Sequence, residues 1–172
     1  MKRTLVVVDM QNDFIDGALG TKEAVAIVPA VKKKIEEYKE NGDKIIFTRD
    51  THGEDYMKTQ EGKRLPVPHC IKDTEGWQIR EVLDADSNAD RIIDKDRFGY
   101  TGWSEFKAED LGDIEVIGLC TDICVVSNAI LLKAIFPENK ISVDASCCAG
   151  VTPEAHEAAL TTMASCQIEI IR

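Results

Sequence analysis

The sequence predicts an α/β fold, a three-layer α-β-α arrangement in which helices cover both faces of a six-stranded, mainly parallel sheet. Two observations predict it. Short runs rich in β-branched residues, such as residues 4–8, are typical of strands that are buried on both faces. Segments with a helical period separate these runs, and a strand–helix–strand order produces crossovers between parallel strands. The 172 residues are expected to form a single domain, 1–172, because this length supports one hydrophobic core.

Each expected element has a local signature. We expect strands at residues 4–8, 44–48, 91–94, 115–119, 141–143 and 168–171. We expect helices at residues 24–39, 77–83, 123–135 and 153–165. Gly42 supplies a left-handed cap after the first helix, and Pro137 ends the third. Pro153 lies in the first turn of the fourth, where proline is tolerated. Residues 51–76 fit neither period, and so long a loop in a compact domain is usually functional.

Composition and charge exclude several classes of function. The formal net charge of -10 opposes binding to nucleic acid, whose phosphates need a basic surface. The longest apolar runs are too short to span a membrane, and residues 1–4 lead straight into a strand instead of a signal peptide. The six cysteines are therefore expected to be free thiols in a reducing cytoplasm. The acidic surface does not forbid self-association into a homo-oligomer.

Four reactive side chains fall at or just after the ends of expected strands. Asp9, Asp50 and Lys95 follow the first three strands, and Cys124 lies just beyond the fourth. The carboxyl ends of parallel strands share one edge of the sheet, where open α/β sheets bind ligands, so these side chains are expected to line one cleft. Taken singly, Asp9 could be a structural carboxylate and Lys95 a solvated surface residue. Their convergence is what favours a catalytic role.

Cys124 has a setting that is typical of a reactive thiol. Gly118 ends the preceding strand, and Thr121 or Asp122 can cap the helix that follows. Cys124 then lies in the first helical turn, where unpaired N–H groups favour a thiolate and can hold an oxyanion during acyl transfer. A nearby lysine would favour the thiolate further. The alternative is that Cys124 is a small apolar core residue, which is the common fate of a free cysteine.

The long loop carries a second group of polar residues. Asp50 and His52 are two residues apart and share a side of an extended segment, and Glu61 and His69 follow. Two histidines with one or two carboxylates suit zinc, manganese or iron. The alternative is a polar loop with surface histidines. The third histidine, His156, falls in an alanine-rich helix and is expected to be only a helix residue.

Several segments carry a family resemblance. Residues 7–14 (Val-Val-Asp-Met-Gln-Asn-Asp-Phe) resemble the opening motif of the isochorismatase-like cysteine hydrolases. Residues 118–125 (Gly-Leu-Cys-Thr-Asp-Ile-Cys-Val) resemble the nucleophile motif of that family. Residues 48–52 and 68–71 resemble the metal loop of its nicotinamidase/pyrazinamidase-type amidases, and the segment around Lys95 resembles the family's lysine segment. The motifs appear in order and cover essentially the whole chain.

The resemblance implies a Rossmann-like sheet and a catalytic triad of Asp9, Lys95 and Cys124. It also implies a cis peptide bond before Cys120, which would aim the N–H groups of Cys120 and Cys124 into an oxyanion hole. It implies a divalent metal, zinc above all with manganese and iron as alternatives, on a set of ligands that Glu61 can complete: Asp50, His52, His69 and Glu61. The candidates that it implies for the wall of a ring pocket are Phe14, Leu19, Tyr100 and Trp103.

The expected function is that of an amidohydrolase that releases ammonia from a small carboxamide. Nicotinamide is the expected substrate, converted to nicotinate through a thioester on Cys124. One alternative is a related amidase acting on a ureido or N-carbamoyl compound with the same triad and no need for the metal. An alternative of another class is a non-catalytic ligand-binding or redox-responsive protein. Cys120 occupies a position that is often alanine in the family, and the thiol nucleophile argues against vinyl-ether hydrolysis.

Overall fold

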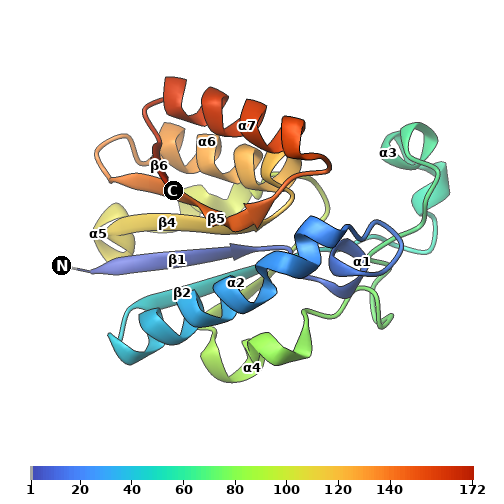
Figure 1. Ribbon diagram of the computed structural model, residues 1–172, viewed down its shortest axis with the longest axis horizontal. Helices are drawn as coiled ribbons and strands as arrows, with labels where there is room; N and C mark the ends of the chain where they lie inside the picture. Colours follow the sequence, from blue (N-terminus) through green and yellow to red (C-terminus); the bar gives the residue numbers. More distant parts are fainter. Residues whose placement is uncertain (1) are drawn as a thin grey trace.

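Six parallel strands form one sheet in the order β3-β2-β1-β4-β5-β6 in the computed structural model, which describes residues 2–172 (Figure 1). The strands are β1 (Arg3–Val8), β2 (Lys44–Asp50), β3 (Arg91–Lys95), β4 (Asp113–Leu119), β5 (Ile141–Ala149) and β6 (Glu169–Ile171). The chain builds one half of the sheet outward from β1 and then returns to build the other half from β4. In open α/β sheets a ligand binds at the carboxyl ends of the strands where the order reverses, here β1 and β4.

Helices cover both faces of the sheet, so the predicted three-layer α/β class is confirmed. α2 (Lys22–Glu40) packs on one face, and α6 (Val126–Ile135) and α7 (Pro153–Ser165) pack on the other (Figure 1). The shorter helical segments are α1 (Asn12–Ile15), η1 (Tyr56–Lys58), α3 (Gln60–Arg64), η2 (Glu81–Leu83), α4 (Ala85–Asn88), η3 (Thr101–Glu105), α5 (Ala108–Leu111) and the π-helical turn η4 (Thr121–Val125). No helix within residues 2–172 combines the length and apolar character needed to cross a membrane.

The central strand β1 positions the site. Its last four residues, all aliphatic, are at most 1% exposed. Val8 pairs with Thr48 of β2 on one side and with Gly118 of β4 on the other. Gly118 has a φ of +118°, and a Cβ there would lie 2.1 Å from the Val8 carbonyl oxygen, so only glycine fits. The first polar residue after β1, Asp9, therefore lies in the middle of the carboxyl edge of the sheet.

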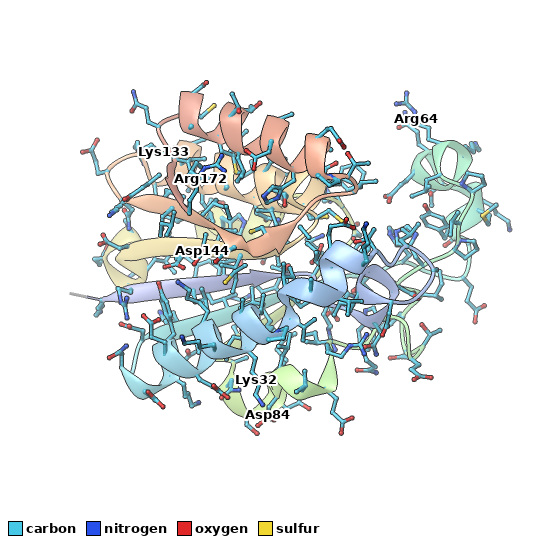
Figure 2. The ribbon with its side chains drawn as sticks, viewed as in Figure 1. Lys32, Arg64, Asp84, Lys133, Asp144 and Arg172 are labelled. Carbon is cyan, nitrogen blue, oxygen red and sulfur yellow. The ribbon has the colours of Figure 1, made fainter. Side chains whose placement is uncertain are left out.

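A buried ionic cluster ties α2 to the sheet. Lys34 Nζ on α2 lies 2.9 Å from Glu115 Oε1 on β4 and 2.9 Å from Asp144 Oδ2 on β5, and Figure 2 labels Asp144. Tyr38, one turn after Lys34, donates its hydroxyl hydrogen to Glu115 Oε2 at 2.8 Å. Charges this well buried remain stable only when paired, so the cluster fixes where α2 lies on the sheet.

Three local predictions were wrong. Residues 77–83 form no helix apart from the single turn of η2, because Ile79 forms an isolated antiparallel bridge with Gln11 and holds this segment extended. The loop at residues 51–76 contains two short helices, η1 and α3, that are too brief to show a helical period. The strand expected at residues 141–143 extends to Ala149, so Cys147 and Cys148 lie inside β5 and are buried there.

Candidate active site

The carboxyl edge of the sheet brings together all four strand-end residues. Asp9 and Lys95 are buried, and so are Asp50 and Cys124. Asp9 directly follows β1, Asp50 ends β2 and Lys95 ends β3. Cys124 comes from η4, the turn after β4. Residues predicted from four separate segments of the sequence therefore form one cluster.

Lys95 lies at the centre of this cluster. Its Nζ is 2.6 Å from Asp9 Oδ2 and 3.5 Å from Cys124 Sγ. Asp50 Oδ1 lies 3.4 Å from the same nitrogen, and the Arg97 carbonyl oxygen accepts a hydrogen bond from it at 3.1 Å. The ammonium group therefore links the carboxylate of Asp9 to the thiol of Cys124, the arrangement expected of the predicted triad.

Burial controls the protonation of the three groups. Burial raises the pKa of Asp9, and the nearby Lys95 offsets this only in part. Burial and the charge of Asp9 raise the pKa of the Cys124 thiol well above its ordinary value, although Lys95 acts in the opposite direction. Burial alone would lower the pKa of Lys95, but the charges of Asp9 and Cys124 raise it. The resting site therefore holds a protonated lysine and a thiol, whereas the position at a helix start had suggested a thiolate.

The turn that carries Cys124 has a geometry of its own. The peptide bond between Leu119 and Cys120 is cis, as the resemblance implies. Cys124 is the fourth residue of η4, so it does lie in the first helical turn after β4. Neither expected cap closes this turn, because Asp122 Oδ1 accepts the N–H of Val151 at 3.0 Å instead. The hydroxyl of Thr121 is 2.7 Å from Nδ1 of His156. This histidine therefore connects α7 to the turn that carries Cys124, whereas the sequence indicated no contact for it.

Two residues that hold Asp9 and Asp50 in place were not predicted. Thr48 donates its hydroxyl hydrogen to Asp9 Oδ1 at 2.6 Å, which orients the carboxylate toward Lys95. Gln11 holds the backbone of Asp50 at both ends: its Oε1 accepts the Asp50 N–H at 2.7 Å, and its Nε2 donates to the Asp50 carbonyl at 2.8 Å. Gln11 is 0% exposed, and a glutamine two residues after a strand-end aspartate is a signal in the sequence that could have been followed.

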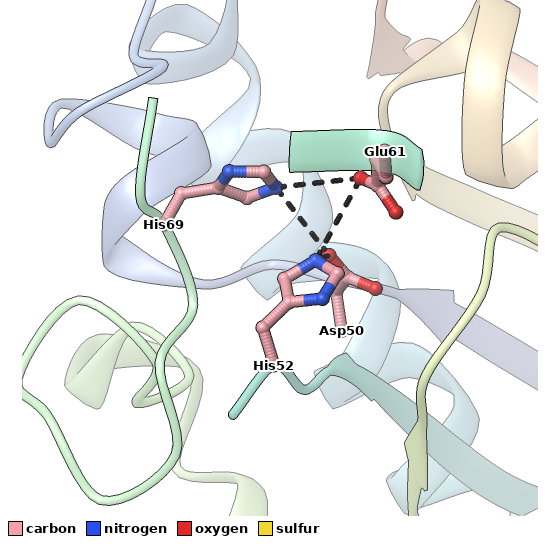
Figure 3. Close-up of side chains that lie close together, drawn as sticks. All are labelled: Asp50, His52, Glu61 and His69. Atoms are coloured by element: carbon pink, nitrogen blue, oxygen red, sulfur yellow. Dashed lines mark ion pairs between the residues drawn. The ribbon is translucent and has the colours of Figure 1, made fainter. Parts of the chain in front are cut away.

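The second predicted group also assembles, as Figure 3 shows. One ligand atom from each of Asp50, His52, Glu61 and His69 lies within 4.8 Å of the others. His52 Nε2 is 2.9 Å from Asp50 Oδ2 and 3.7 Å from Glu61 Oε1. His69 Nε2 is 3.7 Å from Asp50 Oδ2 and 3.9 Å from Glu61 Oε1. Asp50 therefore directs Oδ2 toward the two histidines of this cluster and Oδ1 toward Lys95.

The cluster has the features of a metal site. His52 Nε2 is buried, and its 2.9 Å contact with Asp50 Oδ2 lacks the geometry of a hydrogen bond, so among residues 2–172 its lone pair is available for an ion. His69 Nδ1 lies 2.8 Å from the Val67 carbonyl oxygen, and donating to it leaves Nε2 free to face the cluster. Two imidazoles with two carboxylates are a borderline donor set that suits zinc. The four residues therefore fit a divalent metal.

Metal binding is directly testable. We expect the purified chain to take up about one zinc ion per molecule by equilibrium dialysis and elemental analysis. Zinc at about 100 times its dissociation constant should stabilise the fold by about 2.7 kcal/mol, seen as a higher melting temperature. His52→Ala should lose both effects. His156→Ala is the matched control, because His156 lies outside the cluster, and it should keep them; equal loss in both variants would refute the site.

A cavity of about 490 Å³ opens above the cluster. Cys120 and Cys124 line it, together with Asp50, Glu61 and His69 from the second group. One wall comes from α3, which projects beyond the strand ends and carries the labelled Arg64 in Figure 2. A larger open groove of about 960 Å³ lies elsewhere and is lined by none of the predicted site residues.

The structure places the four candidate ring-pocket residues in two groups. Phe14 and Leu19 line the cavity, but Tyr100 and Trp103 do not. Trp103 is 0% exposed and donates its indole N–H to Asn128 Oδ1 at 2.9 Å. Tyr100 packs edge-on against it, with ring centroids 5.2 Å apart. The loop after β3 directs Tyr100 and Trp103 toward α6. Phe98 of the same loop lines the cavity in their place.

Comparison with known proteins agrees with this fold. The family model described as the isochorismatase domain matches residues 3–172. The nicotinamidase/pyrazinamidase of Mycobacterium tuberculosis is 27% identical over 188 residues, which cover 98% of each chain. The crystal structure of a pyrazinamidase/nicotinamidase from Streptococcus mutans has a TM-score of 0.87 at 28% identity and covers 99% of this chain and 100% of that one. That of the Pyrococcus horikoshii pyrazinamidase in complex with zinc has a TM-score of 0.82 at 30% identity and covers 100% and 99%.

The match extends over nearly the whole chain, includes all six strands and contains every residue of the two clusters. The chain therefore belongs to the isochorismatase domain family.

Proposed function

We propose that this amidohydrolase converts nicotinamide to nicotinate and ammonia through a thioester on Cys124. The observation that carries the proposal is the position of Lys95 Nζ between the Asp9 carboxylate and the thiol of Cys124, a residue that lines the cavity. The relatives named nicotinamidase and pyrazinamidase support hydrolysis of an amide C–N bond. The zinc-bound pyrazinamidase of P. horikoshii supports a divalent metal beside the triad.

The first half of the reaction forms the thioester. Asp9 accepts the proton of the Cys124 thiol, a role that suits a carboxylate whose pKa is raised by burial. The thiolate sulfur attacks the amide carbon, and Lys95 stabilises the negative charge that moves between sulfur and carboxylate. The backbone N–H groups of Cys120 and Cys124 would hold the resulting oxyanion. Asp9 then returns its proton to the nitrogen, the C–N bond breaks and ammonia leaves.

The second half of the reaction restores the enzyme. Asp9 takes a proton from a water molecule, whose oxygen attacks the thioester carbon. The C–S bond breaks, Asp9 returns the proton to the sulfur and so restores the Cys124 thiol, and the acid product loses its remaining proton to solvent and leaves as the carboxylate. The same carboxylate serves as base and acid in both halves, which requires its pKa to lie nearer neutrality than that of an exposed aspartate. The complete burial of Asp9 supplies that condition.

The metal cluster lies directly beside the triad, because Asp50 of the cluster places Oδ1 3.4 Å from Lys95 Nζ. A divalent metal on Asp50, His52, Glu61 and His69 would supply a Lewis-acid site for the pyridine nitrogen and so orient the ring. Phe14 and Leu19 add apolar surface to the cavity, which suits a flat aromatic ring.

Ammonia release from nicotinamide tests the proposal. We expect steady release by the zinc-loaded protein and a large loss after treatment with a chelator, restored by added zinc. Benzamide, which lacks the ring nitrogen, is the matched substrate and should be hydrolysed far more slowly. A folded, zinc-loaded protein that releases no ammonia from nicotinamide would contradict the proposal. Activity on a ureido or N-carbamoyl compound that survives the chelator would favour the related amidase instead.

A further inference from the structure

Asn128 makes four hydrogen bonds at the centre of the protein. It lies on α6, one turn after Cys124, and is 0% exposed. Its Oδ1 accepts the backbone N–H of Tyr100 and the indole N–H of Trp103, both at 2.9 Å. Its Nδ2 donates to the carbonyl oxygen of Cys124 at 2.8 Å and to that of Phe98 at 3.1 Å. The amide thus uses both of its acceptor positions and both of its donor hydrogens.

Three of these four bonds hold one loop, residues 96–103, against the helix of the nucleophile. The loop begins directly after Lys95, and its Arg97 carbonyl accepts a hydrogen bond from Lys95 Nζ at 3.1 Å. It also supplies part of the cavity wall through Asp96, Arg97 and Phe98. Phe98 is 45% exposed, so little other packing fixes that part of the wall. The position of the loop relative to Cys124 therefore depends on the Asn128 amide.

We propose that Asn128 is a positioning residue that sets the distance between the nucleophile and the cavity wall at Phe98. The inference rests on the proposed function, since it concerns how that site holds its amide substrate. Asn128 does not line the cavity itself and acts through the loop. Its Nδ2 joins the carbonyl of Cys124 to that of Phe98, and its Oδ1 fixes the next turn of the same loop. Few other side chains of this size offer two donors and two acceptors in one plane.

The test compares two asparagines that hold loops at opposite ends of the sheet. Asn139 Nδ2 donates to the carbonyls of Ala108 and Gly112 at 3.0 and 2.6 Å, beside the start of β4 and far from the strand ends that form the site. We expect Asn128→Ala to raise KM for nicotinamide about tenfold, because a small displacement of a substrate-positioning wall is costly. Both substitutions remove hydrogen bonds and should lower the melting temperature. Asn139→Ala, however, should change KM by less than about twofold.

Two further measurements keep the test independent of folding and of the substrate. Hydrogen–deuterium exchange of a peptide spanning residues 97–104 should be faster in Asn128→Ala and unchanged in Asn139→Ala, even if nicotinamide is not the substrate. Asn128→Ser removes both amide donors and buries no charge, so it serves if the alanine variant fails to fold. Like Asn128→Ala, this variant should raise KM, because the hydrogen bonds that Nδ2 donates to the carbonyls of Cys124 and Phe98 are lost. Unchanged KM and unchanged exchange in the Asn128 variants, or equal KM changes at Asn128 and Asn139, would overturn the inference.

Discussion

Cys124→Ala is expected to abolish ammonia release from nicotinamide, lowering kcat by about 10⁴-fold or more. The sulfur is the atom that bonds to the amide carbon, and no other side chain in the cluster can replace it: Lys95 is protonated and Asp9 is needed as the base. Cys124 is 3% exposed, and loss of one sulfur atom leaves a small gap, so the variant should remain folded. Initial rates of ammonia release and a melting curve of the same sample measure both effects.

The chain offers a matched control for this substitution. Cys166 is an exposed free cysteine that follows α7, outside the cavity. Cys166→Ala removes a thiol without touching the site and should keep full activity. Comparable activity in Cys124→Ala and Cys166→Ala would eliminate Cys124 as the nucleophile and favour a protein that binds its ligand without covalent chemistry.

Asp9→Asn is expected to lower kcat by about 10³-fold, the contribution of a well-placed general acid–base group. The amide keeps the shape of the carboxylate and can still accept the hydroxyl hydrogen of Thr48, but it cannot take the proton of Cys124. KM should change much less than kcat, because the orientation of the ring depends on other groups. Steady-state kinetics with nicotinamide separate the two constants.

The same substitution should also destabilise the fold. It removes the nearest negative charge from the buried Lys95 and leaves Asp50, at 3.4 Å, as the remaining carboxylate. We expect a loss of about 3 kcal/mol in the free energy of unfolding, the lower end for breaking a buried ion pair, because Asp50 still pairs with the buried charge in part. Asp9→Asn with Lys95→Met removes both charges and should regain part of that loss while remaining inactive. A double variant that is no more stable than the single one would contradict this account of the pair.

The fold and the cluster at the strand ends could be predicted from the sequence because both follow from simple periodicities. Short β-branched runs gave the six strands, and the parallel order placed Asp9, Asp50 and Lys95 on one edge without any knowledge of their contacts. The family resemblance extended this to the metal cluster, where Asp50, His52, Glu61 and His69 do lie together. Their roles in binding and catalysis stay predictions.

Other features could not be read from the sequence because they depend on contacts between distant segments. The bridge from Gln11 to Ile79 keeps residues 77–83 extended against their helical pattern. Asp122 looked like a helix cap but bonds to Val151, which is close only in the folded chain. The pKa of Cys124 is raised by its burial and by the charge of Asp9, and the nearby Lys95 offsets this only in part.

Trapping of the acyl-enzyme tests the central claim most directly. The zinc-loaded protein is mixed with nicotinamide, quenched with acid and analysed by peptide mass spectrometry, with hydroxylamine added to a parallel reaction. Our account predicts a mass gain equal to one nicotinoyl group on the peptide that contains Cys124, and formation of nicotinohydroxamate in the presence of hydroxylamine. Ammonia release with neither product would contradict a thioester on Cys124.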